Sequence, residues 1–452
     1  MTSSAYPPAA RRVKPIRLEL DLFPAWRYWR TQRKRGTISV CEAASGNRGL
    51  PRIRGGDSMR TRWKRVGPKP RRQAAMGAGG LEKAVVPEEE FVMTGGHSRR
   101  CFLARAGALA GSLAVWSARA GGSSETKADV KCRPDVIVYR GGYPGWPWVA
   151  RAGRRLVCVL RDDGVHDFSP SGKVLFTSSE DDGKTWAPAT VVADEPGVDD
   201  RNAAIVQLPD GRLMVCYNTY TQDRISRCMV TWSKDNGKTW SRPTPLADLD
   251  ARTRAAPLAL ASGEILIPIY KAPGSGAIAA LSADGGNTWR LSSVPDVPGF
   301  LGDEWSVLEV ERGRVVGILR NSGARDGYFW KTESRDGGRT WEKPVRTNVR
   351  DARSTSPAHL DWHGKTPVLT YADRREVSVS MVTTKDPEFC AWDVEHRVLC
   401  YQYRPDGSAI PDGGYPVSVA VGERRRFIVD YEIRPEGNRI AGYFVDLPAG
   451  WG

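Results

Sequence analysis

Beyond residue 134, apolar and polar residues alternate in short stretches, and a glycine turn interrupts each stretch. Six such stretches are present: WPWVARAGRRLVCVL, AAIVQLPDGRLMVCY, APLALASGEILIPIY, WSVLEVERGRVVGIL, PAHLDWHGKTPVLTY and YPVSVAVGERRRFIVDY. Alternation with a period of two is typical of strands, and a glycine between two such runs is typical of a β-hairpin. The pattern therefore predicts six hairpins.

The turn glycines of the six hairpins recur at regular intervals. They are Gly153, Gly211, Gly263, Gly313, Gly364 and Gly422, separated by 50 to 58 residues. A period of this length in an all-β sequence predicts radial blades, and six units predict a six-bladed β-propeller. The sixth unit lacks an outer strand. We expect residues 135–140 to supply it, so that the N-terminal strand closes the ring and removes an exposed edge.

A second motif, Ser-x-Asp-x-Gly-x-Thr-Trp, follows four of the hairpins. Its copies are SEDDGKTW, SKDNGKTW, SADGGNTW and SRDGGRTW, and TKDPEFCAW is a degraded fifth copy. The motif falls between the third and fourth strands of each predicted blade. Asp and Gly favour tight turns, and a Trp can anchor one sheet against its neighbour. Four copies at different angles around a ring cannot converge on one substrate, so we predict a structural role.

The net charge of +15 is confined to the beginning of the chain. Residues 1–92 contain 20 Lys and Arg against 8 Asp and Glu, whereas the remaining residues contain 47 against 44. The near-neutral propeller gives no electrostatic reason to expect a nucleic-acid partner. Residues 1–92 show no strand or helix period, and we interpret them as a disordered basic segment or as upstream sequence that is not part of the native protein.

Residues 93–120 have the features of an export signal. The segment SRRCFL resembles a twin-arginine motif, a mildly apolar run follows, and Ala118-Arg119-Ala120 is typical of a cleavage site. The apolar run is too short to span a membrane. We therefore expect a periplasmic or secreted propeller of residues 121–452. Its cysteines could pair as Cys216/Cys228 and Cys390/Cys400, or remain free thiols.

The candidate site follows from the hairpin topology. The start of the first strand lies beside the end of the second, so both rim one mouth of the ring. First-strand starts supply Trp146, Arg201, Arg254, Glu304, Arg353 and Tyr415, and second-strand ends supply Tyr270, Arg320, Arg374, Arg375 and Tyr431. Clustered arginines bind carboxylates, phosphates or sulfates through planar bidentate hydrogen bonds. The mouth is thus predicted to bind an acidic ligand.

Over residues 134–446, the sequence resembles the sialidase (neuraminidase) superfamily with BNR/Asp-box repeats. The segment DEWSVLEVERGRVVGILRN is similar to the one that carries a catalytic Glu and a substrate-binding Arg, here Glu304 and Arg320. YADRREVSVSMV is similar to the segment with a further binding Arg, for which Arg374 fits first and Arg375 next. GGYPVSVAVGERRRFIVDYE is similar to the segment that begins with the nucleophilic Tyr, here Tyr415.

The resemblance implies an exported exo-glycosidase that hydrolyses terminal sialic or related acidic sugars with retention. Tyr415 would be the nucleophile and Glu304 its base, because the phenol of a free Tyr has a pKa near ~10 and needs a proton acceptor. Among the acids of the loop RDDGVHDFSPSGK, Asp167 is the first choice for the proton donor, followed by Asp163 and Asp162.

One departure from the family pattern concerns the first blade. The family begins this blade with Arg-Ile-Pro, whereas the matching text here is Gly145-Trp146-Pro147. Either Arg201 or Arg353 replaces the missing arginine, or the ligand is not a standard sialic acid. Trp146 is expected to serve as a stacking platform for a sugar ring.

Two alternatives stay open beside the sialidase hypothesis: a glycosidase for another acidic glycan, and a non-catalytic propeller that binds glycans or protein. No cofactor is expected. The pair His359 and His363 lacks the Glu of a zinc protease motif, and no metal site is expected there.

Overall fold

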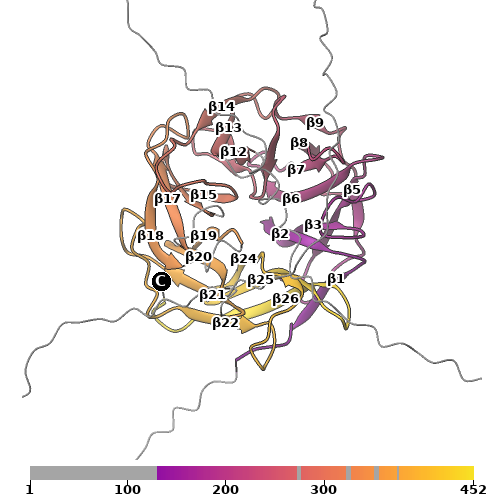
Figure 1. Cartoon of the computed structure of the whole chain (residues 1–452), viewed down its shortest axis with the longest axis vertical. Helices are drawn as coiled ribbons and strands as arrows, with labels where there is room; N and C mark the ends of the chain where they lie inside the picture. Colours follow the sequence, from indigo (N-terminus) through magenta and orange to yellow (C-terminus); the bar gives the residue numbers. More distant parts are fainter. Residues whose placement is uncertain (1–129, 272–275, 322–326, 351–355, 374–375, 452) are drawn as a thin grey trace, which may run out of the picture. The chain divides into compact units, whose positions relative to one another are not determined.

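The structure is a computed structural model that describes residues 130–271, 276–321, 327–350, 356–373 and 376–451. The described residues contain strands, turns and loops but no helix, and the strands form six antiparallel sheets. The prediction of an all-β, six-bladed propeller is confirmed (Figure 1). The predicted basic segment 1–92 and export signal 93–120 lie outside the described residues.

Each sheet is one blade. In the first five blades the strands follow the chain from the inside of the ring to the outside, and in the sixth blade the N-terminal β1 is the outermost strand. The first blade comprises β2 (Gly145–Ala152), β3 (Arg155–Asp162), β4 (Lys173–Ser179) and β5 (Thr190–Ala193). The second comprises β6 (Asp199–Gln207), β7 (Leu213–Tyr220), β8 (Ser226–Ser233) and β9 (Thr244–Pro245). The third comprises β10 (Ala251–Thr253), β11 (Leu258–Ala259), β12 (Ile265–Lys271), β13 (Ala277–Ser282) and β14 (Arg290–Ser293).

The remaining blades repeat the arrangement. The fourth comprises β15 (Trp305–Glu311), β16 (Arg314–Leu319), β17 (Tyr328–Ser334) and β18 (Val345–Arg350). The fifth comprises β19 (His359–His363), β20 (Thr366–Asp373), β21 (Ser378–Thr383) and β22 (Val398–Gln402). The sixth comprises β23 (Asp412–Gly413), β24 (Val417–Gly422), β25 (Arg425–Ile433), β26 (Arg439–Asp446) and the N-terminal β1 (Val136–Arg140).

The ring is closed as the sequence predicts. Strand β1 pairs antiparallel with β26, with Val136 opposite Gly442 and Arg140 opposite Arg439. Figure 1 shows β1 at the outer edge of the last blade. The first and last parts of the propeller therefore share one sheet, which leaves no gap between the first and sixth blades.

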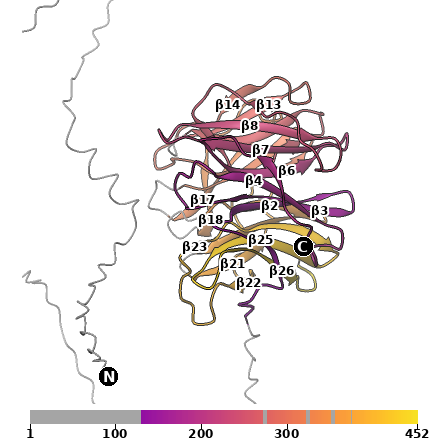
Figure 2. The same ribbon diagram turned by 90° about the vertical axis from the view of Figure 1, so that its right-hand side faces the viewer.

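The core lies between the blades. Strand β7 is buried along its whole length, and β3 is buried at every position after Arg155. Figure 2 shows the second, first and sixth blades one above another, so that each sheet covers the face of the next. Because second strands are covered on both faces, their sequences are almost continuously apolar rather than strictly alternating.

The Ser-x-Asp motif forms a closed turn at the outer side of the blade. In the second blade, Asp235 accepts hydrogen bonds from the Thr239 backbone N–H at 2.9 Å and from the Thr239 hydroxyl at 2.5 Å. The Ser233 hydroxyl accepts a bond from the Gly237 N–H at 2.8 Å. The predicted structural role of these residue types is therefore supported by their own contacts.

The same turn packs against the preceding blade. The ring of Trp240 lies 5.6 Å from the ring of Phe176 on β4. Gly237 has a φ of 87°, and a Cβ at this position would lie 2.5 Å from the Phe176 ring. The motif glycine is therefore required both by the turn and by the contact between blades.

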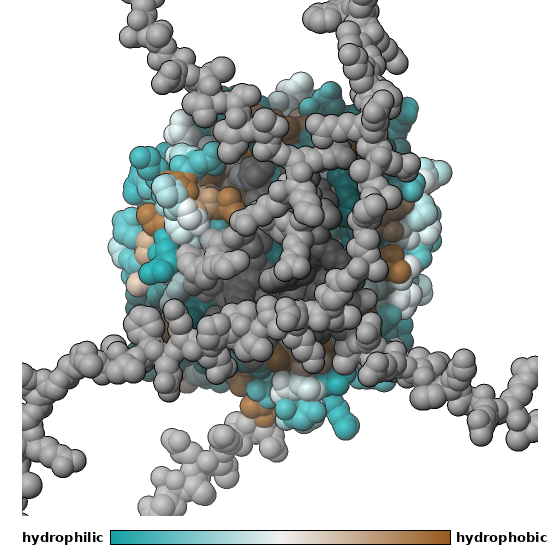
Figure 3. Space-filling view, in the orientation of Figure 1, coloured by the Kyte–Doolittle hydropathy of each residue, from teal (hydrophilic) through white to brown (hydrophobic). Residues whose placement is uncertain are grey.

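The side chains visible around the ring in Figure 3 are mainly hydrophilic. The large apolar side chains that are exposed, such as Val165, Ile225 and Leu291, come from different blades. The part of the chain that the structure describes has no helix with the length and apolarity needed to cross a membrane. The six cysteines from Cys132 to Cys400 are all free, so neither of the two possible disulfides is formed.

Candidate active site

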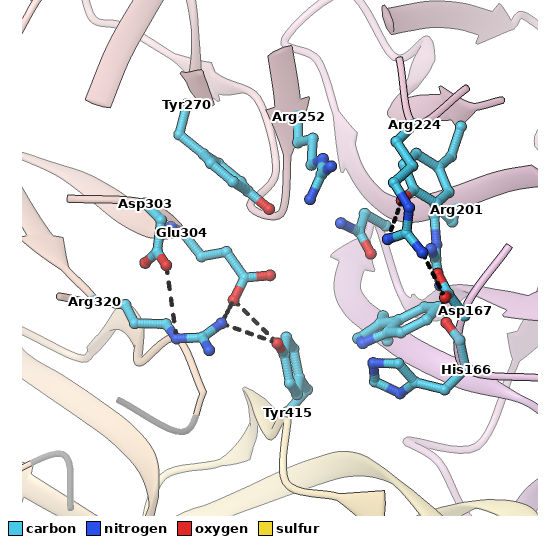
Figure 4. A pocket seen from close by; sticks show the side chains of 13 residues that line it. His166, Asp167, Arg201, Arg224, Arg252, Tyr270, Asp303, Glu304, Arg320 and Tyr415 are labelled. Carbon is cyan, nitrogen blue, oxygen red and sulfur yellow. Dashed lines mark hydrogen bonds and ion pairs between the residues drawn. The ribbon is translucent and has the colours of Figure 1, made fainter. Parts of the chain in front are cut away.

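A cavity of about 370 Å³ lies where the blades converge at one mouth of the ring (Figure 4). Residues of five blades line it: Trp146, His166, Asp167, Arg201, Asn202, Tyr220, Arg224, Arg252, Tyr270, Asp303, Glu304, Arg320 and Tyr415. The hairpin topology explains most of this set, since first-strand starts and second-strand ends meet at the same end of each blade. His166, Asp167 and Arg224 come from the loops that follow second strands. The cavity has the size of an ordinary small-molecule site.

Tyr415, Glu304 and Arg320 form a hydrogen-bonded cluster on one side of this cavity (Figure 4). The Tyr415 hydroxyl donates to Glu304 Oε2 at 3.0 Å. Arg320 Nη1 donates to the Tyr415 hydroxyl oxygen at 3.1 Å and also to Glu304 Oε2. A phenol thus lies between a proton acceptor and a fixed cation, an arrangement that can generate and stabilise a phenolate.

The charge state of Arg320 follows from its surroundings. Burial disfavours the guanidinium cation, but Tyr415, Asp303 and Glu304 outweigh burial and raise the pKa of Arg320 well above its ordinary value. The Asp303 carboxylate lies 4.0 Å from Arg320 Nε. Arg320 is therefore a permanent cation beside the Tyr415 oxygen.

The backbone of Tyr415 is held by the buried carboxylate of Asp430. Asp430 Oδ1 accepts the N–H groups of Tyr415 at 2.7 Å and Tyr431 at 2.8 Å. Its Oδ2 accepts the hydroxyls of Tyr401 at 2.8 Å and Tyr403 at 2.6 Å. Burial raises the pKa of Asp430 to about 6. These bonds fix the segment that enters β24 and so position the Tyr415 ring.

Arg254 lies beneath Tyr415 and not at the rim where the sequence placed it. Its side chain is buried, and Nη2 donates to the carbonyls of Pro147 at 3.2 Å and Tyr415 at 3.4 Å. The reason is that the inner strand of the third blade is interrupted after Thr253. Arg252, which pairs in register with Tyr270, occupies the rim instead.

The three candidate acids of the β3–β4 loop occupy different environments. Asp167 lines the cavity and forms an ion pair with Arg224 at 3.1 Å. Asp162 is buried, accepting the Tyr139 hydroxyl at 2.8 Å and the Tyr143 N–H at 3.1 Å, and is not part of the cavity wall. Asp163 is also outside the wall. Asp167 is the member of this group that can meet a ligand.

Trp146 lines the cavity but is not an open stacking platform. Its side chain is only 4% exposed. The Arg201 guanidinium lies over the indole ring at 4.4 Å, and His166 contacts the ring edge-on at 5.4 Å. The face expected to receive a sugar is therefore covered by Arg201, and Trp146 supports that arginine.

Several predicted residues cannot be compared with the structure. Arg353, Arg374 and Arg375 lie outside the described residues.

Tyr431 is described and buried, with its hydroxyl donating to Asp412 at 2.9 Å. It is therefore part of the wall behind the cavity rather than of its surface.

His166, Arg224 and Arg252 line the cavity, although the sequence did not single them out. His166 and Arg224 belong to loops between second and third strands, which vary between blades and lie outside the repeat. The sequence could still have indicated these residues, because loops that follow second strands lie at the mouth of the ring. The same argument had already identified Asp167 as a candidate. His166 Nδ1 lies 2.6 Å from Asp412 Oδ2, so that its ring has a fixed orientation.

No cluster of metal-ligating side chains occurs within the described ranges. His359, one of the two histidines considered for a metal, is buried beside Trp148 and accepts the Ser418 N–H at 3.3 Å. Its role in these contacts is structural.

The fold, with its polar cavity at one mouth of the ring, is that of a six-bladed propeller of the sialidase type. The chain belongs to the BNR repeat-like domain family, whose profile matches residues 155–398, more than half of the 452 residues. Among curated proteins, none is a significant match.

Three solved structures illustrate the similarity of fold. A protein of unknown function from Dyadobacter fermentans is 22% identical, with a TM-score of 0.61, covering 71% of this chain and 100% of its own. The K499G mutant of NanB sialidase from Streptococcus pneumoniae is 12% identical, with a TM-score of 0.58 and coverage of 70% of both chains. The Hadza microbial sialidase Hz136 is 16% identical, with a TM-score of 0.55, covering 68% and 66%.

Proposed function

We propose that the protein is a glycoside hydrolase of the sialidase type, which removes terminal sialic or related acidic sugars with retention of configuration. The observation that carries the proposal is the cluster of Tyr415, Glu304 and Arg320. The sialidases among the structures of similar fold support the substrate class.

The choice of nucleophile has an electrostatic reason. A sialic acid carries a carboxylate on its anomeric carbon, which would repel a carboxylate nucleophile, and sialidases depart from the two-carboxylate scheme by using a Tyr. Glu304 accepts the hydrogen bond of the Tyr415 hydroxyl, which supports its role as the base that takes the phenolic proton. Arg320 contacts the same oxygen and can also bind the substrate carboxylate.

Hydrolysis would proceed in two steps. In the first, the Tyr415 oxygen bonds to the anomeric carbon while Glu304 takes the phenolic proton, and Asp167 protonates the leaving oxygen as the glycosidic bond breaks. In the second, Asp167 takes a proton from water, whose oxygen bonds to the anomeric carbon. The bond to Tyr415 breaks as the water oxygen bonds to this carbon, and Glu304 returns its proton to the departing phenolate.

Hydrolysis of fluorogenic substrates tests the proposal. The protein is expected to release 4-methylumbelliferone from an α-sialoside and to lose this activity in Tyr415→Phe. Hydrolysis of a glucuronide of the same fluorophore, without hydrolysis of the sialoside, would indicate a glycosidase for another acidic sugar. Turnover that is unaffected by Tyr415→Phe would reject the mechanism, and absence of turnover on all acidic substrates would favour a non-catalytic binding propeller.

We also propose that the protein is exported to the periplasm or secreted, on the basis of the twin-arginine segment in residues 93–120. Replacing Arg99 and Arg100 together by Lys is expected to retain the protein in the cytoplasm of a bacterial host. Unchanged export of this variant would contradict the proposal.

A further inference from the structure

Three arginines gather around one tyrosine on the cavity wall formed by the second and third blades. We call Arg201, Arg224, Arg252 and Tyr220 the arginine wall. The guanidinium carbons of Arg201 and Arg252 lie 5.3 Å and 5.2 Å from the centre of the Tyr220 ring. Arg224 Nη1 donates to the Tyr220 hydroxyl at 3.3 Å. All four residues line the same cavity as Tyr415.

The wall lies across the cavity from the reactive cluster. Figure 4 shows Arg201 and Arg224 on the opposite side from Glu304 and Arg320, with Arg252 pointing into the space between them. Arg320 belongs to the fourth blade and is already engaged with Glu304 and Tyr415. The arginine wall is therefore separate from the cation at the reacting centre.

The carboxylates near Arg201 do not balance the positive charge of the wall. Asp199 accepts two hydrogen bonds from Arg161, at 3.0 Å each, and approaches Arg201 Nε only to 3.8 Å. Arg201 Nε is buried and has no hydrogen-bond partner among the described residues. Burial lowers the pKa of Arg201, and the neighbouring charges of Arg161 and Arg252 lower it further, against the opposing effect of Asp199.

Arg252 has no ion-pair partner in the part of the chain that the structure describes. Its side chain donates one hydrogen bond, from Nε to Ser226 Oγ at 3.1 Å. Arg224 has a closer carboxylate, that of Asp167 at 3.1 Å. The wall thus presents to the cavity the guanidinium of Arg252, unpaired within the described ranges, and that of Arg201, whose neighbour Asp199 is shared with Arg161.

We infer that the arginine wall is a subsite for a second oxyanion on the substrate, in addition to the acidic group that Arg320 would bind. The inference rests on the proposed function for its substrate class, a glycan with two acidic groups. Guanidinium groups bind carboxylates and sulfate esters alike through charge-assisted hydrogen bonds, and this chemistry is shared by both possible sources of the second anion.

Thermal unfolding of the full chain tests the subsite without requiring turnover. Sodium sulfate and sodium acetate, at ionic strength matched to sodium chloride, are expected to act as probes of the wall. At least one of them should raise the unfolding midpoint of the wild type by a few degrees relative to chloride. A shift with sulfate alone points to a sulfate ester, and a shift with acetate points to a carboxylate.

The variant Arg252→Gln is expected to lose this shift, whereas the exposed control Arg312→Gln keeps it. The control also corrects for the general stabilising effect of sulfate on proteins. Should Arg252→Gln fail to fold, Arg224→Gln replaces it, since the Arg224 side chain is 60% exposed. Equal shifts in the wall variant and the control, or no shift in the wild type, would overturn the subsite.

The same measurement on Tyr415→Phe separates the two proposals. This variant is expected to retain the anion-dependent shift, because the wall does not contact the Tyr415 hydroxyl. If Tyr415→Phe loses catalysis but keeps the shift, the substitution has affected the nucleophile and not the arginine wall. If the wild type turns over sialosides but shows no shift, the subsite is rejected while the proposed function stands.

Discussion

The Tyr415 hydroxyl donates a 3.0 Å hydrogen bond to Glu304, although the two residues are 111 positions apart and belong to different blades. Both side chains are buried, at 8% and 4% exposure. They meet because each lies just before the inner strand of its blade, β15 or β24, at the same mouth of the ring. A phenol and a carboxylate paired in this way are suited to nucleophilic catalysis.

Replacing Glu304 by Gln removes the proton acceptor while retaining a side chain of similar size. We expect kcat on an acidic glycoside to fall by roughly 10²- to 10⁴-fold, because general base catalysis contributes about this much. The exposed control Glu342→Gln should retain wild-type kcat. If Glu304→Gln turns over at the wild-type rate across the pH range, Glu304 is not the base.

Replacing Arg320 by Lys retains the charge but not the planar group that reaches Tyr415 and Glu304 together. We expect kcat/KM to fall by about 10- to 100-fold, the size of the loss of a hydrogen bond to a charged group. Steady-state kinetics on the same glycoside measure it, with Arg312→Lys as the control. An unchanged kcat/KM would show that Arg320 contacts neither substrate nor transition state.

We expect the Ser-x-Asp motif to contribute to stability and not to catalysis. Asp235→Ala removes the acceptor of both Thr239 hydrogen bonds, at 2.9 Å and 2.5 Å. We expect the unfolding midpoint to fall by a few degrees while kcat/KM stays unchanged, since the motif lies outside the cavity wall. Lys234→Ala in the same turn is the control. A selective loss of activity at constant stability would contradict the structural role.

The buried His359 makes stability depend on pH. Burial lowers its pKa to about 4 in the folded protein, whereas an exposed His has a value near ~6.5. Below pH ~6.5 the unfolded chain takes up a proton that the folded protein excludes, so that stability is full above this pH and is lost as the pH falls towards 4. The loss is about 3 kcal/mol.

Chemical denaturation at several pH values measures this dependence. His359→Gln should flatten the decline in stability between pH 6.5 and pH 4, and the exposed His396→Gln should leave it unchanged. An identical decline in all three proteins would assign the acid sensitivity to other groups.

Much of the fold could be predicted because it repeats. The glycine turns gave the period, the period gave six blades, and the unpaired sixth blade required a closing strand. The same register located Glu304, Arg320 and Tyr415, since first-strand starts and second-strand ends meet at one mouth.

Where the repeat is broken, prediction failed. The inner strand of the third blade is interrupted between β10 and β11, which brings Arg252 rather than Arg254 to the rim. His166 and Arg224 lie on loops whose lengths differ between blades, so no register locates them. The sequence could not show that Trp146 is buried beneath Arg201, because the contact between the indole ring and the guanidinium group depends on packing between two blades.

The most direct test of the central claim is the identification of the covalent intermediate. The protein is incubated with an activated 3-fluorosialosyl fluoride, digested and analysed by mass spectrometry, with Tyr415→Phe as the control. We predict a mass increase of one fluorosialyl group on the peptide that contains Tyr415, and no adduct in the variant. Turnover of sialosides without an adduct, or with an adduct on another residue, would contradict Tyr415 as the nucleophile.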